Sequence, residues 1–459
     1  MSYLERLEAY KEEMLQMLRE LIAIPSVEGE AEEGAPFGRE VQRAYEYMLE
    51  RGREEGFSIF DADHYGGHLA FGTGPGSMGI LVHLDVVPAG SGWEFPPFEG
   101  VITEEGRLYG RGAQDDKGPA AAAFYAMKAL KDEGVVPGRE VRLILGLDEE
   151  THWKGMKYYL DRAGAPDFSV TPDGDFPVIH GEKGILIFEI AGKFSRGRKD
   201  GLALRSIEGG NAANMAADWA KALVSHPEGA SFYAGIKEKL AAYKQRTGRQ
   251  LAARGRGKSL EIEAQGISAH GATPEKGLNA ISVLMEFLGE LEFVNEDHKD
   301  FVAFYNRHLG FCLDGSALGC GLEDGPSGKL VLNVGKIQMD EESGLITVNI
   351  RYPISSSEEE VYAAMTPVLN RYNYGIVKLD HKAPIFIPED APLVTTLMEV
   401  YRKHSGDLET RPQIIGGGTY ARAVPNAVAF GVTFPGEPEV QHQKNEYISI
   451  DSLMKAARI

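Results

Sequence analysis

The chain has 459 residues, of which 43% are hydrophobic and 25% charged, and its formal net charge is −20. This length predicts two or three domains that each bury a core. The negative charge argues against a nucleic-acid partner, because phosphates would be repelled over most of the surface.

The N-terminal stretch, residues 1–27, is charged and helical in period, and it lacks the apolar core and small-residue cleavage site of a signal peptide. No apolar run approaches the roughly 18 residues of a membrane span. The two cysteines, Cys312 and Cys320, form no CxxC motif and are interpreted as ordinary thiols in a reducing compartment. We therefore expect a cytoplasmic protein without a membrane partner.

The first part of the chain alternates helical and strand patterns. Helices are predicted at residues 3–22 and 37–55, and strands in "HLAFGTG" and "GILVHLD". The stretch "GPAAAAFYAMKALKDEG" predicts a helix, with Pro119 near its first turn and Gly134 after its last. Strands are predicted again in "EVRLILGLDEE" and "FSVTPDG". This alternation favours a mixed, mostly parallel sheet flanked by helices, an α/β fold.

After about residue 183 the pattern changes to that of a smaller α+β layer. Strands are predicted in "ILIFEIAGKF", "SLEIEAQGISAHG", "KLVLNVGKIQM" and "LITVNIRYPIS", with helices near 211–223, 278–291 and 357–371. From about residue 382 the α/β pattern returns, with a helix near 392–404, a strand in "NAVAFGVT" and a helix from about 450. We predict a discontinuous catalytic domain, 1–182 and 383–459, interrupted by an inserted domain, 183–382.

Histidine and acidic side chains follow the predicted strands at the points where these end. His83 and Asp85 share one side of an extended chain, because strand side chains alternate. In open α/β sheets, sites form at the carboxyl ends of strands. One sheet edge could therefore gather several such residues, namely His83, Asp115, Glu150, Asp173 and His442.

Two histidines and three carboxylates suit two divalent ions, with zinc preferred and manganese or cobalt as alternatives. Asp115 is the natural bridge between ions ~3.5–4 Å apart, since a helix N-terminus favours its ionised form. Asp85 can accept the second ring N–H of His83 and fix its tautomer. Glu149 and Glu150 are adjacent and point apart, so one can bind metal while the other acts as general base.

Six motifs carry a resemblance to a known family, and they run in that family's order over nearly the whole chain. They are "VHLDVVPAG", "GRGAQDDKGP", "LDEETHWKG", "TPDGDFPV", "GISAHGATPEKGLNA" and "GGGTYAR". The chain resembles the zinc-dependent exopeptidases and amidohydrolases that include aminoacylase, carnosinase, succinyl-diaminopimelate desuccinylase and carboxypeptidase G. It is most similar to the bacterial dipeptidase V (Xaa-His dipeptidase, carnosinase-like) branch.

The resemblance implies a role for each matching residue. His83, Asp115 and Asp173 would hold one ion, and Asp115, Glu150 and His442 the other. Glu149 would be the general base, and the peptide bond after Asp115 would be cis. His270 would polarise the scissile carbonyl. The residues that would anchor the substrate's C-terminal carboxylate are Asn214, Arg351, Gly417, Gly418 and Thr419.

The predicted activity is hydrolysis of dipeptides with a free amino end, by a metal-bridging water that Glu149 activates. One alternative is an amidohydrolase that releases the acyl group of an N-acyl amino acid on the same fold. Another is a non-catalytic binding protein, which the loss of a ligand or of the base would favour. The inserted domain resembles the enlarged lid of monomeric relatives, so a monomer is expected.

Overall fold

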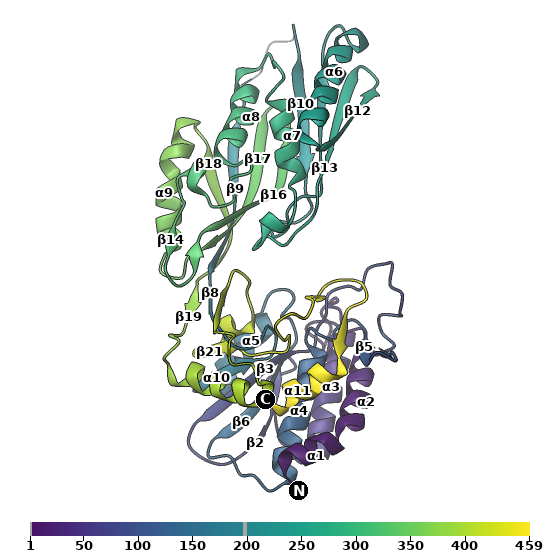
Figure 1. The fold of residues 1–459 in the computed structure, drawn as a ribbon, viewed down its shortest axis with the longest axis vertical. Coiled ribbons are helices and arrows are strands. Elements are labelled where there is room, and N and C mark those ends of the chain that lie inside the picture. Colours follow the sequence, from purple (N-terminus) through teal and green to yellow (C-terminus); the bar gives the residue numbers. More distant parts are fainter. Residues whose placement is uncertain (1, 196–199) are drawn as a thin grey trace. The chain divides into compact units, whose positions relative to one another are not determined.

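The computed structural model describes residues 2–195 and 200–459 and divides into two compact units (Figure 1). The first unit comprises Met1–His180, Ile387–Gln413 and Gly418–Ile459. The second comprises Gly181–Phe386 and Ile414–Gly417. In the described parts of the chain, no helix combines the length and the hydropathy that crossing a membrane requires.

The first unit is built on a mixed sheet. Its strands, in spatial order, are β1 (Ser58–Asp61), β2 (Gly67–Phe71), β6 (Glu140–Gly146), β3 (Ser77–His83), β7 (Phe168–Thr171), β21 (Ala427–Ala429) and β8 (Ile179–Glu182). Strands β6, β3, β7 and β21 are parallel, whereas β1 and β2 run antiparallel at one end. The predicted mixed sheet flanked by helices is confirmed, and its parallel centre aligns the carboxyl ends of β6, β3 and β7.

Helices cover both faces of this sheet. They are α1 (Tyr3–Ala9), α2 (Lys11–Ile22), α3 (Arg39–Glu54), α4 (Lys117–Asp132), α5 (Lys154–Ala163), α10 (Pro392–Ser405) and α11 (Ile450–Arg458). On one face α3, α4 and α11 pack on Leu69, Val82 and Leu143, and α10 packs on Val170. On the other face Tyr159 of α5 contacts His68. A small sheet, β22 (Tyr447–Ser449), β5 (Arg107–Tyr109) and β4 (Val101–Ile102), completes the unit.

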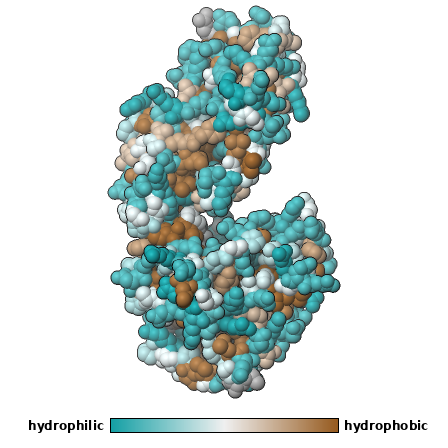
Figure 2. Space-filling view, viewed as in Figure 1, coloured by the Kyte–Doolittle hydropathy of each residue, from teal (hydrophilic) through white to brown (hydrophobic). Residues whose placement is uncertain are grey.

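Short segments connect the two units. Strand β8 contributes residues to both units, and β19 (Ile385–Phe386) and β20 (Gln413–Ile415) pair with it. The side of the molecule seen in Figure 2 is mainly hydrophilic on each unit, with small separate hydrophobic patches.

The second unit is an antiparallel sheet packed against helices. Its strands, in spatial order, are β12 (Gln250–Arg256), β13 (Ser259–Gln265), β11 (Trp219–Ser225), β10 (Ala203–Gly209), β16 (Val331–Met339), β17 (Ser343–Tyr352), β9 (Gly184–Lys193) and β18 (Gly375–Lys382). Its helices are α6 (Ala230–Thr247), α7 (Ala280–Leu288), α8 (Glu296–His308) and α9 (Glu358–Arg371). A hairpin of β14 (Glu323–Asp324) and β15 (Gly328–Lys329) and two 3-10 turns, Pro274–Lys276 and Ser316–Leu318, complete the unit.

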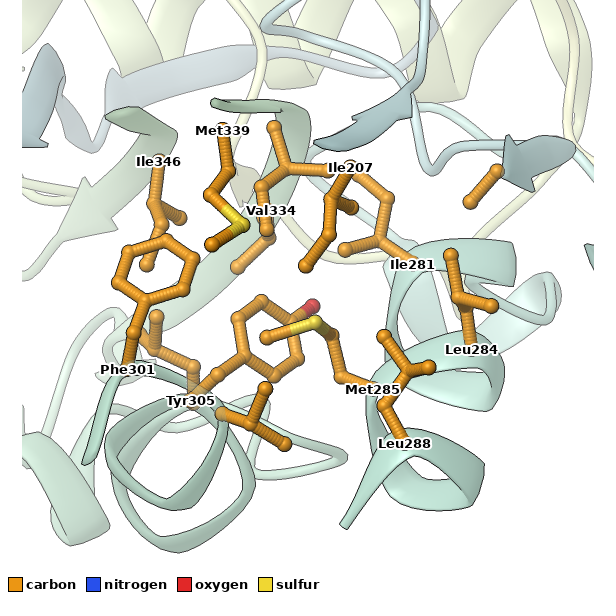
Figure 3. Packing of buried hydrophobic residues seen from close by; sticks show 14 of the residues in the cluster. Ile207, Ile281, Leu284, Met285, Leu288, Phe301, Tyr305, Val334, Met339 and Ile346 are labelled. Carbon is orange, nitrogen blue, oxygen red and sulfur yellow. The ribbon is translucent and has the colours of Figure 1, made fainter. Parts of the chain in front are cut away.

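The core of the second unit lies between the sheet and helices α7 and α8. Figure 3 shows Ile207 and Val334 of the sheet facing Met285 of α7 and Tyr305 of α8. Helix α7 begins at a cap, because the side chain of Asn279 accepts the backbone N–H of Ile281 at 2.9 Å. These contacts hold one face of the sheet in the core and leave the other face for polar side chains.

Two helix predictions were wrong. The predicted helix near 211–223 is the end of a loop followed by strand β11, in which Ala220, Ala222 and Val224 alternate into the core. Burial at every second residue is the pattern of a strand, and here it outweighs the helix propensity of alanine. The predicted helix 3–22 is two helices, α1 and α2, separated at Tyr10.

Candidate active site

Three neighbouring parallel strands end in the residues that the sequence placed at one sheet edge. His83 is the last residue of β3, Glu149 and Glu150 follow β6, and Asp173 follows β7. Because β3 pairs with both β6 and β7, these four residues lie at adjacent strand ends. The topology, rather than proximity in sequence, brings them together.

The Asp115 carboxylate lies between two imidazole rings. Its Oδ1 is 2.8 Å from Nε2 of His83, and its Oδ2 is 2.9 Å from Nε2 of His442. Nε2 of His442 is also 3.0 Å from the Glu150 carboxylate. The peptide bond between Asp115 and Asp116 is cis. The two oxygens of one carboxylate therefore face two different nitrogen donors, as a bridging ligand would.

Among the residues that the structure describes, two groups of donor atoms are compact enough to hold a metal ion. His83, Glu149 and Asp173 offer ligand atoms within 4.8 Å of one another, and so do His83, Asp115 and Glu150. Asp173 thus lies beside both His83 and Glu149.

Asp85 supports the site differently from the prediction. Nδ1 of His83 is 3.0 Å from the backbone carbonyl of Asp85, whereas the nearer carboxylate oxygen is 3.5 Å away. The Asp85 carboxylate instead accepts the backbone N–H groups of Glu149 at 3.1 Å and Glu150 at 3.0 Å. One residue therefore orients the imidazole through its main chain and the two glutamates through its side chain.

A buried ion pair behind Asp115 was not foreseen. Glu446 accepts the backbone N–H groups of Gln114 (2.9 Å) and Asp115 (3.2 Å), and its other oxygen accepts Nη1 of Arg111 at 2.5 Å. Glu446 and Arg111 are 0% and 2% exposed. The pair thus ties the Asp115 loop to the segment that carries His442. Only the proximity of Glu446 to His442 in sequence could have signalled it.

The carboxyl groups of the cluster are buried close together, and this crowding of negative charge shifts their pKa values. Burial, together with neighbouring carboxylates, raises the pKa of Asp173 to about 7 and the pKa values of Glu149 and Glu150 above their usual range. Burial opposes the charge of His442, but hydrogen bonds to Asp115 and Glu150 raise its pKa to about 11. Without a metal ion, protons must offset the negative charge of these carboxylates. Nitrogen and oxygen donors in such a cluster suit a divalent cation, which would supply that positive charge instead.

This excess charge predicts how the metal-free protein responds to pH. Asp173 has an ordinary pKa of 3.8 and a folded-state pKa of about 7, so its stabilising contribution is complete below pH 3.8 and is lost as the pH rises through 7. The raised pKa of His442 likewise makes the free energy of unfolding fall as the pH rises above its ordinary pKa of 6.5. We expect the melting temperature of chelator-treated protein to fall between pH 5.5 and pH 8 by scanning calorimetry.

Added zinc should therefore raise the melting temperature more at pH 8 than at pH 5.5, because protons compete for its ligands at low pH. His83→Ala/Asp173→Asn protein is the matched control, and its pH dependence should be flatter. An equal or larger zinc effect at pH 5.5 would contradict this account.

Most of the other predicted site residues belong to the second unit. Asn214 and His270 are exposed there, and Arg351 is buried in β17. The backbones around the two exposed residues are paired. The N–H of Gly271 donates to the Asn214 carbonyl at 2.7 Å, and Met215 and His270 form an isolated antiparallel β-bridge. In the loop 416–419, Gly417 belongs to the second unit, and Gly418 and Thr419 belong to the first. Thr419 is buried and caps the 3-10 turn Tyr420–Ala423.

Comparison with known proteins gives consistent matches over the chain. Residues 79–459 match the model of peptidase family M20/M25/M40. A Bacillus subtilis (strain 168) protein named "Putative dipeptidase YtjP" is 37% identical over 455 residues, which cover 98% of this chain and 96% of that protein.

Solved structures share the fold at lower identity. Human carnosine dipeptidase 1 has 16% identity and a TM-score of 0.56, with 99% of this chain and 96% of that chain covered. Aminoacylhistidine dipeptidase from Vibrio alginolyticus has 16% identity and a TM-score of 0.56, with 97% and 95% covered. These matches confirm the resemblance that the six motifs predicted.

Proposed function

The chain belongs to peptidase family M20/M25/M40, and we propose that it is a metal-dependent dipeptidase that hydrolyses dipeptides with a free amino end. The observation that carries this proposal is the Asp115 carboxylate, which faces His83 on one side and His442 on the other. The name of the Bacillus subtilis relative and the fold shared with two dipeptidases support the same substrate class.

The proposed metal ligands are His83, Asp115 and Asp173 for one ion, and Asp115, Glu150 and His442 for the other. Two divalent ions, zinc first and manganese or cobalt as alternatives, would supply Lewis-acid activation of water and of the peptide carbonyl. Asp85 holds the backbone of Glu150, and Glu446 holds the backbone of Asp115, by the hydrogen bonds described above.

Glu149 is the proposed general base. It takes one proton from the attacking water as the water oxygen bonds to the carbonyl carbon. It then gives this proton to the amide nitrogen as the carbon–nitrogen bond breaks, so that a carboxylic acid and a free amine result. The Glu149 backbone suits this role because its N–H is held by Asp85 at 3.1 Å and its carbonyl by Nε1 of Trp153 at 2.5 Å.

We assign recognition of the remaining substrate to the other predicted residues. Arg351 can bind a C-terminal carboxylate in bidentate fashion, and His270 can donate to the developing oxyanion. Asn214, Gly417, Gly418 and Thr419 are proposed to add polar contacts to the same carboxylate. A monomeric, cytoplasmic state completes the proposal.

The test is hydrolysis by metal-reconstituted protein. Chelator-treated protein receives zinc, manganese or cobalt and is incubated with Ala-Ala, Leu-Leu, β-Ala-His, a tripeptide and N-acetyl-Leu, and products are followed by mass spectrometry. We expect metal-dependent cleavage of the free dipeptides. Cleavage of N-acetyl-Leu alone would replace the dipeptidase with a deacylase. Inactivity on the whole panel, with two ions bound, would favour a non-catalytic binding protein.

A further inference from the structure

The second unit buries an unusual row of polar side chains on the face of its sheet opposite the hydrophobic core. Asn333 of β16 and Asn349 of β17 are direct cross-strand partners, and Arg351 follows Asn349 on the same face. Their exposed fractions are 1%, 0% and 4%. Their neighbours in sequence, such as Val334 and Val348, point into the core. Burying polar groups is unfavourable unless they are bonded, so the row requires an explanation.

Asn349 is bonded to the arginine assigned to the substrate carboxylate. Nε of Arg351 donates to Oδ1 of Asn349 at 3.0 Å. An arginine Nε–H can only donate, so the atom that faces it must be the amide oxygen. The side chain of Asn349 is buried and its strand is central in the sheet, between β16 and β9. Asn349 therefore restricts the direction in which the guanidinium can point.

Asn333 is bonded to the loop that carries the other recognition residues. Its Nδ2 donates to the carbonyls of Ala213 at 3.1 Å and Met215 at 2.9 Å, on either side of Asn214. Gly335 lets this loop approach the strand, because a Cβ there would lie 2.4 Å from the Ala213 carbonyl oxygen. Residues 214–216 in turn pair with 269–271, which include His270.

Each asparagine retains one buried atom without a hydrogen-bond partner among the described residues. These atoms are Oδ1 of Asn333 and Nδ2 of Asn349. An apolar pair of similar size would avoid this unfavourable burial. Amides at both positions are instead explained by the bonds that they make on their other sides, to the Asn214 loop and to Arg351.

We propose that Asn333 and Asn349 are positioning residues for substrate recognition: Asn349 fixes the Arg351 guanidinium, and Asn333 fixes the loop pair that carries Asn214 and His270. This inference rests on the proposed function, in which Arg351 binds the substrate carboxylate and His270 acts on the scissile carbonyl. It predicts that the two asparagines affect different steps, although they are neighbours in the sheet.

The experiment compares a dipeptide with its C-terminal amide on the zinc-loaded protein. Asn349→Leu should raise KM for the dipeptide about tenfold or more, leave kcat within about threefold, and change little for the amide, which lacks the carboxylate. Asn333→Asp, which removes the N–H donors, should lower kcat about tenfold for both substrates, because His270 acts on the scissile carbonyl of each. It should raise KM only for the dipeptide, because Asn214 on the same loop is assigned to the carboxylate. Asn349→Ser, which keeps an oxygen acceptor, is the second variant if Asn349→Leu folds poorly by circular dichroism, and it should show the same KM effect in weaker form.

Arg351→Ala separates failure of this inference from failure of the proposed function. If Arg351→Ala removes the preference for the free dipeptide, and Asn349→Leu adds nothing to it in the double variant, Asn349 acts through Arg351. If Arg351→Ala removes the preference but Asn349→Leu retains it, the positioning role is refuted while the proposed function stands. If Arg351→Ala leaves the preference intact, the carboxylate assignment itself is wrong.

Discussion

Glu149→Gln should lower the rate of dipeptide hydrolysis about 10²–10⁴-fold, the range for loss of a general base, while both metal ions remain bound. Gln has the shape of Glu but cannot accept the proton of the attacking water. The hydrogen bonds from Asp85 and Trp153 should survive, because they are made to the backbone of residue 149. Initial rates and metal content measured on the same preparation test this.

The same substitution gives a second, independent readout. Burial raises the pKa of the Glu149 carboxyl well above its usual range, so the metal-free fold favours a neutral side chain there. The metal-free Gln variant should therefore melt no lower than the metal-free wild type at pH 8. Glu104→Gln, in an exposed turn of the same unit, is the matched control and should leave the rate unchanged. Wild-type rates in Glu149→Gln would remove Glu149 from the mechanism.

The geometry of the candidate metal site was predictable from sequence to the extent that it follows from strand order. His83 and Asp173 were predicted at strand ends, and parallel pairing of β3 with β6 and β7 places such ends side by side. Strand order does not predict the position of His442, because this residue lies in a loop rather than at a strand end and has a φ of +61°. Its place beside Asp115 depends on long-range contacts, among them the bonds of Glu446 to the Asp115 loop.

What the sequence did not reveal are pairings between distant segments. Nothing in the spacing of Arg111 and Glu446 indicates that they form a buried ion pair. Asp85 was correctly placed beside His83, but the choice between its carbonyl and its carboxylate depends on where the Glu149 and Glu150 backbones pass. In the second unit, the alanines near β11 favoured a helix by local propensity, whereas pairing with β10 and β13 makes the segment a strand.

Asp115→Asn should weaken metal binding by about 100-fold or more, because it replaces one of two ligand oxygens by an amide NH₂ that cannot coordinate. In the wild type these oxygens face Nε2 of His83 and of His442. The amide cannot bridge the two sides and carries no negative charge, so one substitution weakens the binding of both proposed ions. At metal concentrations well above the dissociation constant, a 100-fold loss removes about 2.7 kcal/mol of metal-derived stabilisation. Zinc titration followed by melting temperature and metal analysis measures both effects.

Two variants make this prediction specific to the bridging position. His442→Ala should lose the ion on one side only, because His83, Asp115 and Asp173 remain, so about one ion per chain should be retained. Asp116→Asn should keep two ions, since Asp116 lies on the other side of the cis bond and its carboxylate accepts the backbone N–H of His83, a bond that an amide oxygen can replace. If Asp116→Asn loses metal and Asp115→Asn does not, the bridge has been assigned to the wrong member of the pair. If the two aspartate variants both keep two ions, the centre is held without a bridging carboxylate, and the contacts of Asp115 with the two histidines serve only to hold the metal-free fold.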